Sequence, residues 1–405
     1  MGFVVSEDKT LKRMALYMFG IMAVLVCFVV ALEHRVEQKP NPEEIEKELL
    51  MQEGTDVVEL PTPTVTPPNV EVAAQGGHAD EETEVWELWQ YMELESMEEL
   101  APEFGERCIL IKKPVGQCEC ELEDDLINHK FTFRIISDTE FLQVASMMRV
   151  YGEEFYFGPA AEGEFLTEFG VLNLDEDGRK VTEFSFLPDG YYVQQITEKD
   201  DFYILNLLRY KEVYDKIVVL DAGHGGKDPG AGGENYKVKE SERALTMLLY
   251  LKEMLEENTD IKVLCTRTED VKLELYQRVE LALGTDADLF ISFHCNAAES
   301  KSRNGSEVLY NKLQGVEDAF NSKAFAKLCL TKLVEALGTK RNGIVDRQDL
   351  HIVRRATMPV VLLETAYLSN ANDLAKLKDN ENLKAVAAGI YEAILEAYEL
   401  MGVEE

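Results

Sequence analysis

The sequence predicts an α/β fold for its C-terminal half, with a mainly parallel, twisted sheet flanked by helices. A small β-rich domain and an N-terminal transmembrane helix are predicted to precede it. Three observations support this prediction: strand-like and helix-like patterns alternate beyond residue 216, short alternating apolar runs fill 108–210, and 14–32 carries no charge. Alternating strands and helices are typical of a parallel sheet covered on both faces. A chain of 405 residues has room for two folded domains.

The uncharged run at 14–32 is long enough to cross the hydrocarbon core of a membrane as a helix. Lys9, Lys12 and Arg13 precede it, so the positive-inside rule places residues 1–13 in the cytoplasm and the rest of the chain outside. Secretion after cleavage of a signal peptide is the alternative. The run is long for the apolar part of a signal peptide, and no Ala-x-Ala-like site follows it. Both features favour a single-pass anchor in the cell membrane.

Acidic residues are concentrated in the first part of the chain. The first 215 residues contain 17 Lys and Arg against 45 Asp and Glu, whereas 216–405 contains 24 against 31. This charge argues against a nucleic-acid partner, because phosphate contacts need clustered Lys and Arg. Within the acidic part, residues 33–84 combine Glu-rich runs with a Pro- and Thr-rich segment. Such a composition cannot bury a core and predicts an extended tether.

Residues 85–210 are predicted to form a β-rich accessory domain. Turn signals separate its short apolar runs, which indicates a small antiparallel sheet or sandwich. The runs lie at 108–111, 131–135, 190–194 and 202–205, and the turn signals at 175–178 and 188–190. Cys108 with Cys118 or Cys120 would close a small disulfide loop if the domain is exported. A metal-binding Cys-Glu-Cys pair and free thiols are the alternatives, and free thiols are favoured.

The region 216–402 is predicted to form the parallel sheet and its helices. Its predicted strands are 217–221, 261–265, 288–293, 306–310, 350–353 and 359–364. Its predicted helices are 240–255, 274–283, 322–337 and 382–398. Apolar residues recur at spacings of three and four in the last two helices, which is the pattern of an amphipathic helix.

Three polar residues lie at the ends of predicted strands. His224 belongs to the run Asp-Ala-Gly-His-Gly-Gly at 221–226, His294 follows the strand at 288–293, and Glu364 ends the strand at 359–364. Because sites in parallel α/β sheets form beyond the carboxyl ends of the strands, these side chains are expected to meet. Two imidazoles and a carboxylate predict a metal site. The glycine-rich run lacks Gly-Lys-Ser/Thr and therefore does not predict a nucleotide site.

A catalytic zinc site uses three protein ligands and keeps one position open for water. His224 and His294 supply two ligands, and Glu240 opens the helix that follows the glycine-rich loop. Zinc lowers the pKa of its bound water to about 7, and a second carboxylate must then move the proton to the leaving nitrogen. Glu364 is placed for that role. A structural, hydrogen-bonded role is the alternative for each residue alone, but three strand ends in agreement favour a site.

Residues 216 to about 400 resemble the zinc-dependent N-acetylmuramoyl-L-alanine amidase family, the type-3 amidase domain of bacterial cell-wall hydrolases. The matching stretches are 218–230, Glu240 with Leu245, Thr266 and Arg267 with Asp270, Arg278, 292–297 and 359–370. The resemblance implies that His224, Glu240 and His294 bind Zn²⁺ and that Glu364 is the catalytic acid/base. It also implies peptidoglycan as the substrate, cleaved between the lactyl group of muramic acid and L-alanine.

The sequence departs from the family pattern at a few positions. Ser241 stands where a Lys commonly follows the ligand Glu, Leu283 stands where an Asn is common, and Ala-Tyr at 366–367 replaces Gly-Phe. None of these positions is one of the four proposed site residues. His351, on the predicted strand at 350–353, either contacts the metal ligands or the substrate, or is simply a packed or exposed histidine, and the packed or exposed role is favoured.

Two expectations remain open from the sequence. The β-rich domain occupies the place where related proteins carry a wall-targeting β-sandwich of the AMIN type, and a plain spacer is the alternative. A non-catalytic wall-binding relative that keeps the fold is the alternative to an active enzyme. Retention of His224, Glu240, His294 and Glu364 favours the enzyme.

Overall fold

The structure of the protein is a computed structural model. The structure describes residues 103, 105–142, 147–151, 154–157, 165–199, 202–231, 238–315 and 319–402. The predicted cytoplasmic segment, membrane anchor and tether all lie outside these residues. Among the residues described, no helix is both long and apolar enough to cross a membrane.

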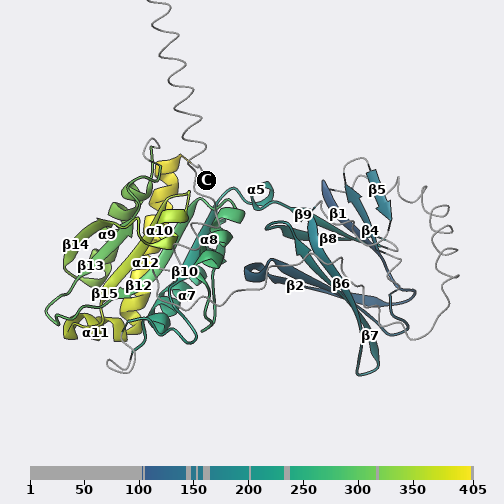
Figure 1. Ribbon diagram of the computed structural model, residues 1–405, viewed down its shortest axis with the longest axis horizontal. Helices are drawn as coiled ribbons and strands as arrows, with labels where there is room; N and C mark the ends of the chain where they lie inside the picture. The colour runs from purple at the N-terminus through teal and green to yellow at the C-terminus, as the bar shows by residue number, and fades with distance from the viewer. Residues whose placement is uncertain are drawn as a thin grey trace, which may run out of the picture. The chain divides into compact units, whose positions relative to one another are not determined.

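The β-rich region consists of two antiparallel sheets, as the alternating runs predicted (Figure 1). One sheet has the order β5-β4-β1-β9-β8 and the other the order β2-β3-β7-β6. The strands are β1 (Arg107–Lys112), β2 (Cys118–Asp125), β3 (Lys130–Ser137), β4 (Met147–Tyr151), β5 (Glu154–Phe157), β6 (Leu166–Glu176), β7 (Arg179–Pro188), β8 (Val193–Lys199) and β9 (Phe202–Leu208), with a 3₁₀ turn η2 (Leu126–Asn128) after β2.

Alternate residues of these strands form an aromatic core between the two sheets. Phe131 and Phe133 of β3 are buried with Tyr203 and Leu205 of β9. A strand exposes alternate residues to opposite faces, so each sheet needs only one apolar face to build this core. The predicted strand at 190–194 was placed too early, because β8 begins at Val193.

The cysteines of this region are free thiols. Cys108 is buried, and the Sγ atom of Cys118 lies 3.3 Å from the hydroxyl of Tyr203. This agrees with the free thiols that the sequence favoured, and the alternative, a disulfide between Cys108 and either Cys118 or Cys120, is not formed here. Neither Cys118 nor Cys120 belongs to a group of three metal-binding side chains within the described part of the chain.

A six-stranded sheet forms the C-terminal region, in the order β11-β10-β12-β15-β13-β14. Its strands are β10 (Ile217–Ala222), β11 (Lys262–Cys265), β12 (Leu289–Asn296), β13 (Ser306–Tyr310), β14 (Arg341–Asp346) and β15 (Val360–Tyr367). The neighbouring strands β11, β10, β12 and β15 are parallel to one another. Strand β13 is antiparallel to β15, and β14 is parallel to β13. The mixed α/β fold with a mainly parallel sheet is therefore confirmed for this region.

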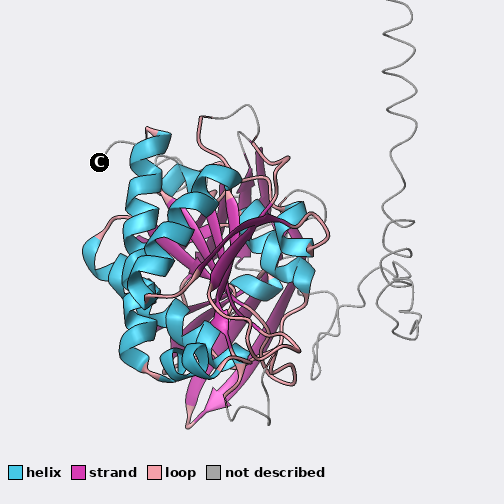
Figure 2. Cartoon of the chain, turned by 90° about the vertical axis from the view of Figure 1, so that its left-hand side faces the viewer, coloured by secondary structure: helices cyan, strands magenta, loops and turns pink. Residues whose placement is uncertain are grey.

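Helices cover both faces of this sheet (Figure 2). They are α5 (Tyr210–Val213), α7 (Glu240–Asn258), α8 (Leu275–Gly284), α9 (Ser322–Leu337), α10 (His351–Arg355), α11 (Ala371–Lys378) and α12 (Asn380–Met401). Val218 and Ile291 of the sheet pack with α7, α9 and α12, whereas Val219 and Phe290 pack with α8 and α10. Neighbouring residues of each strand face opposite layers of helices. Both faces of these strands must therefore be apolar, as in parallel sheets generally.

Helix α9 has the bounds that the sequence predicted, and the residues that cap its two ends explain this agreement. The side chain of Asn321 accepts hydrogen bonds from the backbone N–H groups of Lys323 and Ala324. Gly338 ends the helix in the left-handed conformation, with φ of 57°. An Asn before the first turn and a Gly after the last are strong helix boundary signals.

The prediction of a strand at 350–353 is wrong. Leu350 caps helix α10 and the next three residues form its first turn, in which Ile352 and Val353 are buried. A short apolar run does not distinguish a strand from a buried helical turn. Strand β14, by contrast, was not predicted, because Arg341 and Asn342 open it and Gly343 interrupts its apolar pattern.

Candidate active site

The site lies at the carboxyl ends of β10, β12 and β15. His294 and Glu364 are inside their strands and are paired with each other across the β12–β15 ladder. They therefore share one face of the sheet. Both strands extend further than the sequence predicted, since β12 continues to Asn296 and β15 to Tyr367.

His224 lies in the turn after β10 and has a positive φ of 60°. Two buried arginines hold this turn. Arg267 donates to the carbonyls of Ala222 and Gly223, and Arg278 donates to the carbonyl of His224 at 2.8 Å. Such a conformation is uncommon for a residue other than glycine, so the surrounding hydrogen bonds are what fix it. Both arginines were singled out in the sequence, but without a role.

Two glycines allow the site residues to approach the backbone. A Cβ atom on Gly223 would lie 2.2 Å from the ring of His294. A Cβ atom on Gly230 would lie 2.6 Å from the carboxylate of Glu240, and Gly230 also has a positive φ of 69°. Any side chain at these positions would push a site residue out of place.

The structure brings His224, Glu240 and His294 together. One ligand atom from each lies within 4.8 Å of those of the other two. The Oε1 atom of Glu240 is 2.8 Å from Nδ1 of His294 and 3.2 Å from Nε2 of His224. Glu240 is itself held by the N–H groups of Ala231 and Cys295, at 2.6 and 3.1 Å. The three residues come from a loop, a helix N-terminus and a strand, so only the fold unites them.

Negative charge is in excess around His224. Burial alone opposes protonation of this imidazole, but Glu240 and Asp228 outweigh it and raise the pKa of His224 to about 9. Burial likewise opposes ionisation of Glu240, yet hydrogen bonds from His224 and His294 hold the pKa of Glu240 well below its usual range. A positive charge between these groups is therefore stabilised.

The residues present fit a divalent metal ion. Imidazole nitrogen and carboxylate oxygen are zinc ligands, and three protein ligands with an open position are typical of a catalytic site. Nδ1 of His224 is 2.8 Å from the carboxylate of Asp228, which fixes the ring and leaves Nε2 toward Glu240. A carboxylate behind a histidine ligand is a common supporting contact. Asp228 was not recognised from the sequence, although it lies in the matching stretch four residues after His224.

Glu364 lies beside this group, paired with His294 across the β12–β15 ladder. Its Oε2 atom is buried and accepts no hydrogen bond from the described residues. Burial raises the pKa of Glu364 to about 7; the charges of Glu240 and Glu307 add to this effect, and the two imidazoles oppose it. A buried carboxylate oxygen without a donor is costly, and such groups in native proteins usually have a functional reason.

Behind the site, Asp221 at the end of β10 anchors a buried polar network. Its carboxylate accepts from Arg278 at 2.6 Å, from the hydroxyl of Thr266 at 2.7 Å and from the hydroxyl of Ser292 at 2.5 Å. Asp221 is fully buried. The network ties β10 to β12 and α8 immediately below the turn that carries His224.

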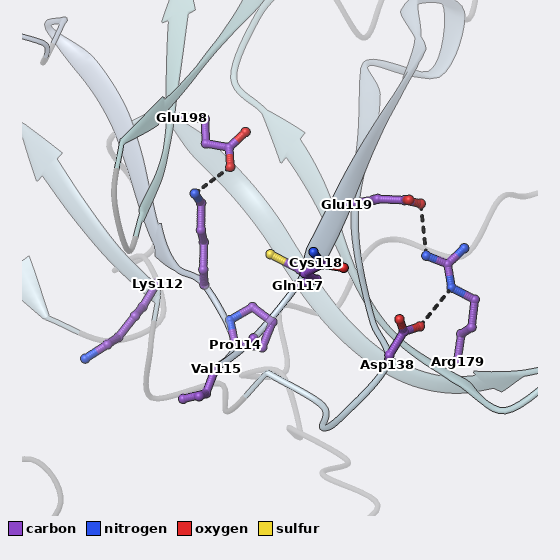
Figure 3. Close-up of a pocket in the computed structure, with 11 residues that line it drawn as sticks. Lys112, Pro114, Val115, Gln117, Cys118, Glu119, Asp138, Arg179 and Glu198 are labelled. Carbon is purple, nitrogen blue, oxygen red and sulfur yellow. Dashed lines mark hydrogen bonds and ion pairs between the residues drawn. The ribbon is translucent and has the colours of Figure 1, made fainter.

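His351 does not belong to the group of metal-binding side chains; it opens helix α10 instead. A separate cavity of about 600 Å³ lies in the β-rich region (Figure 3). In its wall, Lys113 pairs with Glu198, and Arg179 pairs with Glu119 and Asp138. These cations are neutralised by carboxylates of the same wall, so the cavity shows no chemistry comparable to that of the site.

Known proteins match the C-terminal region. A family model described as N-acetylmuramoyl-L-alanine amidase matches residues 218–396. The endolysin of Bacillus phage SPP1 is 33% identical over 185 residues, which is 46% of this chain and 67% of the endolysin. The chain belongs to the N-acetylmuramoyl-L-alanine amidase family. The amidase LytC of Bacillus subtilis is 34% identical over 186 residues, or 46% of this chain, but only 36% of LytC is covered.

A solved structure of the same amidase family also matches this region. The catalytic domain of CwlV from Bacillus (Paenibacillus) polymyxa var. colistinus is 39% identical, with a TM-score of 0.43. The match covers 46% of this chain and 99% of that domain. The four predicted site residues all lie within the range matched by the amidase family model.

Proposed function

We propose that this chain hydrolyses the amide bond between N-acetylmuramic acid and L-alanine in peptidoglycan, as a zinc-dependent amidase that remodels the cell wall. The grouping of His224, Glu240 and His294 within 4.8 Å carries the proposal. The carboxylate of Glu364 beside that group, whose Oε2 atom has no hydrogen-bond partner among the described residues, supports it. Membership of the amidase family supports the choice of bond and substrate.

In this proposal, His224, Glu240 and His294 hold the metal. When bound, zinc lowers the pKa of water and polarises a carbonyl. Asp228 orients the His224 ring, and the N–H groups of Ala231 and Cys295 orient Glu240. The ligands are therefore positioned before a metal binds, which reduces the reorganisation that binding requires.

Glu364 is proposed to move the proton. With a pKa of about 7, its carboxylate is present in both protonation states near neutral pH. It can accept a proton from the attacking water and donate it to the amide nitrogen as the C–N bond breaks. Its Oε2 atom has no partner among the described residues, so no existing hydrogen bond needs to be broken for this transfer.

We also propose that the enzyme works outside the cytoplasmic membrane. The uncharged run at 14–32 and the basic residues before it support a single-pass anchor with the N-terminus inside. Residues 33–84 would act as the tether, and 85–210 as an accessory domain that either targets the wall or acts as a spacer. Secretion after signal cleavage remains the competing arrangement.

The proposal is tested with purified peptidoglycan and the full-length chain. Digestion should release new α-amino groups without new reducing sugar ends. A chelator should abolish the release, and added Zn²⁺ should restore it. Release of reducing ends instead would assign the chain to glycan cleavage. Zinc binding without any release would favour a wall-binding relative that only keeps the fold.

A further inference from the structure

A row of functional side chains crosses the sheet at right angles to the strands. His294 of β12 pairs with Glu364 of β15, and Glu364 pairs in turn with Glu307 of β13. Residues paired in this way project from the same face. Glu307 therefore stands next to Glu364, on the side away from His294. The sequence showed Glu307 only as a residue of a predicted strand, because the β13–β15 pairing cannot be seen there.

Taken alone, the pairing of Glu364 with Glu307 is unfavourable for stability, and the charge of Arg347 interacts favourably with both carboxylates. Like charges directly opposite each other on neighbouring antiparallel strands repel, and their side chains start about 4.5–5.5 Å apart. Two neighbours hold Glu307 in place against this repulsion. Its Oε1 atom accepts from the side-chain amide of Asn296 at 2.5 Å and from the hydroxyl of Tyr367 at 3.3 Å. Both of these hydrogen bonds go to Oε1, which leaves Oε2 as the oxygen that a ligand would meet.

Beyond Glu307 the row continues onto an open surface. The next residue across the sheet is Gly343 of β14, and a Cβ atom there would have nothing within 4 Å. Val345, two residues further along the same face, is 36% exposed. An extended ligand that starts at Glu364 can therefore run past Glu307 and over Gly343 without meeting a side chain at that position.

The reaction creates a charge that this row can receive. Hydrolysis breaks the bond between the lactyl carbonyl carbon and the alanine nitrogen, and a bond from the carbonyl carbon to water oxygen forms. The water supplies both protons that the nitrogen gains, so the products are a lactyl carboxylate and an α-ammonium group. The nitrogen is neutral before cleavage and positive afterwards. A second carboxylate beside the proton donor is suited to bind it.

We propose that Glu307 binds the α-amino group of the released peptide, and that the peptide leaves across β13 and β14 over Gly343. This inference rests on the proposed amidase function and adds the direction in which the substrate lies. Glu307 contacts the amide N–H before cleavage and the ammonium group afterwards. The muramic acid side of the bond then lies on the other side of Glu364, toward His224 and the turn after β10.

The proposal is tested by calorimetric binding of product peptides to the full-length chain. The probes are L-Ala-D-Glu and its analogue with propionyl in place of L-alanyl, which lacks only the amino group. The free amine should increase affinity about 10- to 100-fold, as expected for a charge-assisted hydrogen bond. Glu307→Gln should remove this preference, since it keeps an acceptor for Asn296 and Tyr367 but loses the charge. Glu335→Gln, an exposed site on α9, is the matched control and should retain the preference.

Binding measurements on metal-depleted protein distinguish a contact of the amino group with Glu307 from direct binding of the amine to zinc. A preference that persists without metal in the unaltered chain, and is lost in Glu307→Gln, supports the proposal. Equal affinity for both probes in the unaltered chain would overturn it, and so would an unchanged preference in Glu307→Gln. Either result could accompany full amidase activity, so failure of this inference is distinguishable from failure of the proposed function.

Discussion

Glu240 connects several parts of the site. It begins helix α7, and its carboxylate contacts both imidazoles and the backbone of the turn before the helix. A carboxylate that is 3% exposed and shared by two histidines is stable only if positive charge stays beside it. This arrangement motivates the assignment of His224, Glu240 and His294 as ligands.

Removal of any one ligand is expected to abolish zinc binding. His224→Ala, His294→Ala and Glu240→Ala each leave two protein ligands, too few to hold the ion in competition with water. The measurement is zinc per chain after dialysis, which should fall from near one to near zero. His129→Asn is the control, because it removes a histidine at positive φ in the β-rich region and Asn tolerates that conformation. A ligand variant that keeps full zinc occupancy would show that the set is misassigned.

Glu364→Gln is expected to separate binding from catalysis. The amide has nearly the shape of the carboxylate but cannot carry the proton, so activity should fall on the order of 100- to 10,000-fold. Zinc content should stay near that of the unaltered chain, because Glu364 is assigned to proton transfer. Measurements of zinc content and of amino-group release on the same samples check both expectations. Loss of zinc together with activity would make Glu364 a ligand.

For helices and strands, the sequence predicted the elements whose apolar pattern is local. It did not predict the features that depend on how strands pair with one another. Helix α9 and strands β10, β12 and β15 were found because their apolar patterns and boundary signals are local. Strand β14 and the antiparallel direction of β13 were missed because edge strands carry weak patterns and direction is set by tertiary contacts. The same limit explains the site: His224, His294 and Glu364 end apolar runs, whereas Glu307 gains its place only from register.

The network around Asp221 is expected to stabilise the core of this sheet. In Asp221→Asn, Arg278 loses its buried counter-ion, and leaving one partner of a buried pair uncompensated typically costs about 3–5 kcal/mol. Denaturant unfolding of the full-length chain at neutral pH measures this loss. Glu335→Gln, with the same change of charge on an exposed helix face, should change the free energy of unfolding by less than about 0.5 kcal/mol.

The same network predicts a pH dependence. Burial alone would raise the pKa of Asp221, but Arg278 and the hydroxyls of Ser292 and Thr266 hold it below its usual range. The stabilisation from this carboxylate is therefore present above about pH 4, the value for an unfolded Asp, and is lost as the pH falls through the folded pKa. Stability should decline more steeply below pH 4 in the unaltered chain than in Asp221→Asn. Parallel declines would show that the carboxylate is not selectively stabilised.

At the scale of the whole molecule, the proposed anchor and tether determine which peptidoglycan the site can reach. If the proposed tether is flexible, its residues 36–84, about 49 in number, would have a mean reach of about 35–42 Å, at roughly 5–6 Å times the square root of length. With the accessory domain added, the enzyme would meet glycan strands close to the membrane. This limit would confine cleavage to material near the membrane.

Protease added to intact, wall-free cells is expected to release the folded domains and to leave a short membrane-bound N-terminal fragment. In the proposed arrangement, the tether would offer the protease an accessible chain, whereas the anchor and residues 1–13 would be protected by the membrane. Immunoblots with tags at both ends check this result. Full-length protein in the medium that begins near residue 33 would instead show cleavage and secretion.

Mass spectrometry of digested peptidoglycan tests the central claim most directly. The full-length, zinc-loaded chain should convert purified peptidoglycan into glycan strands with free lactyl carboxylates and stem peptides that begin with L-alanine. Glu364→Gln, run in parallel, should yield almost none of either product. Fragments in which every muramic acid keeps its peptide, from a chain that is folded and loaded with zinc, would contradict the account.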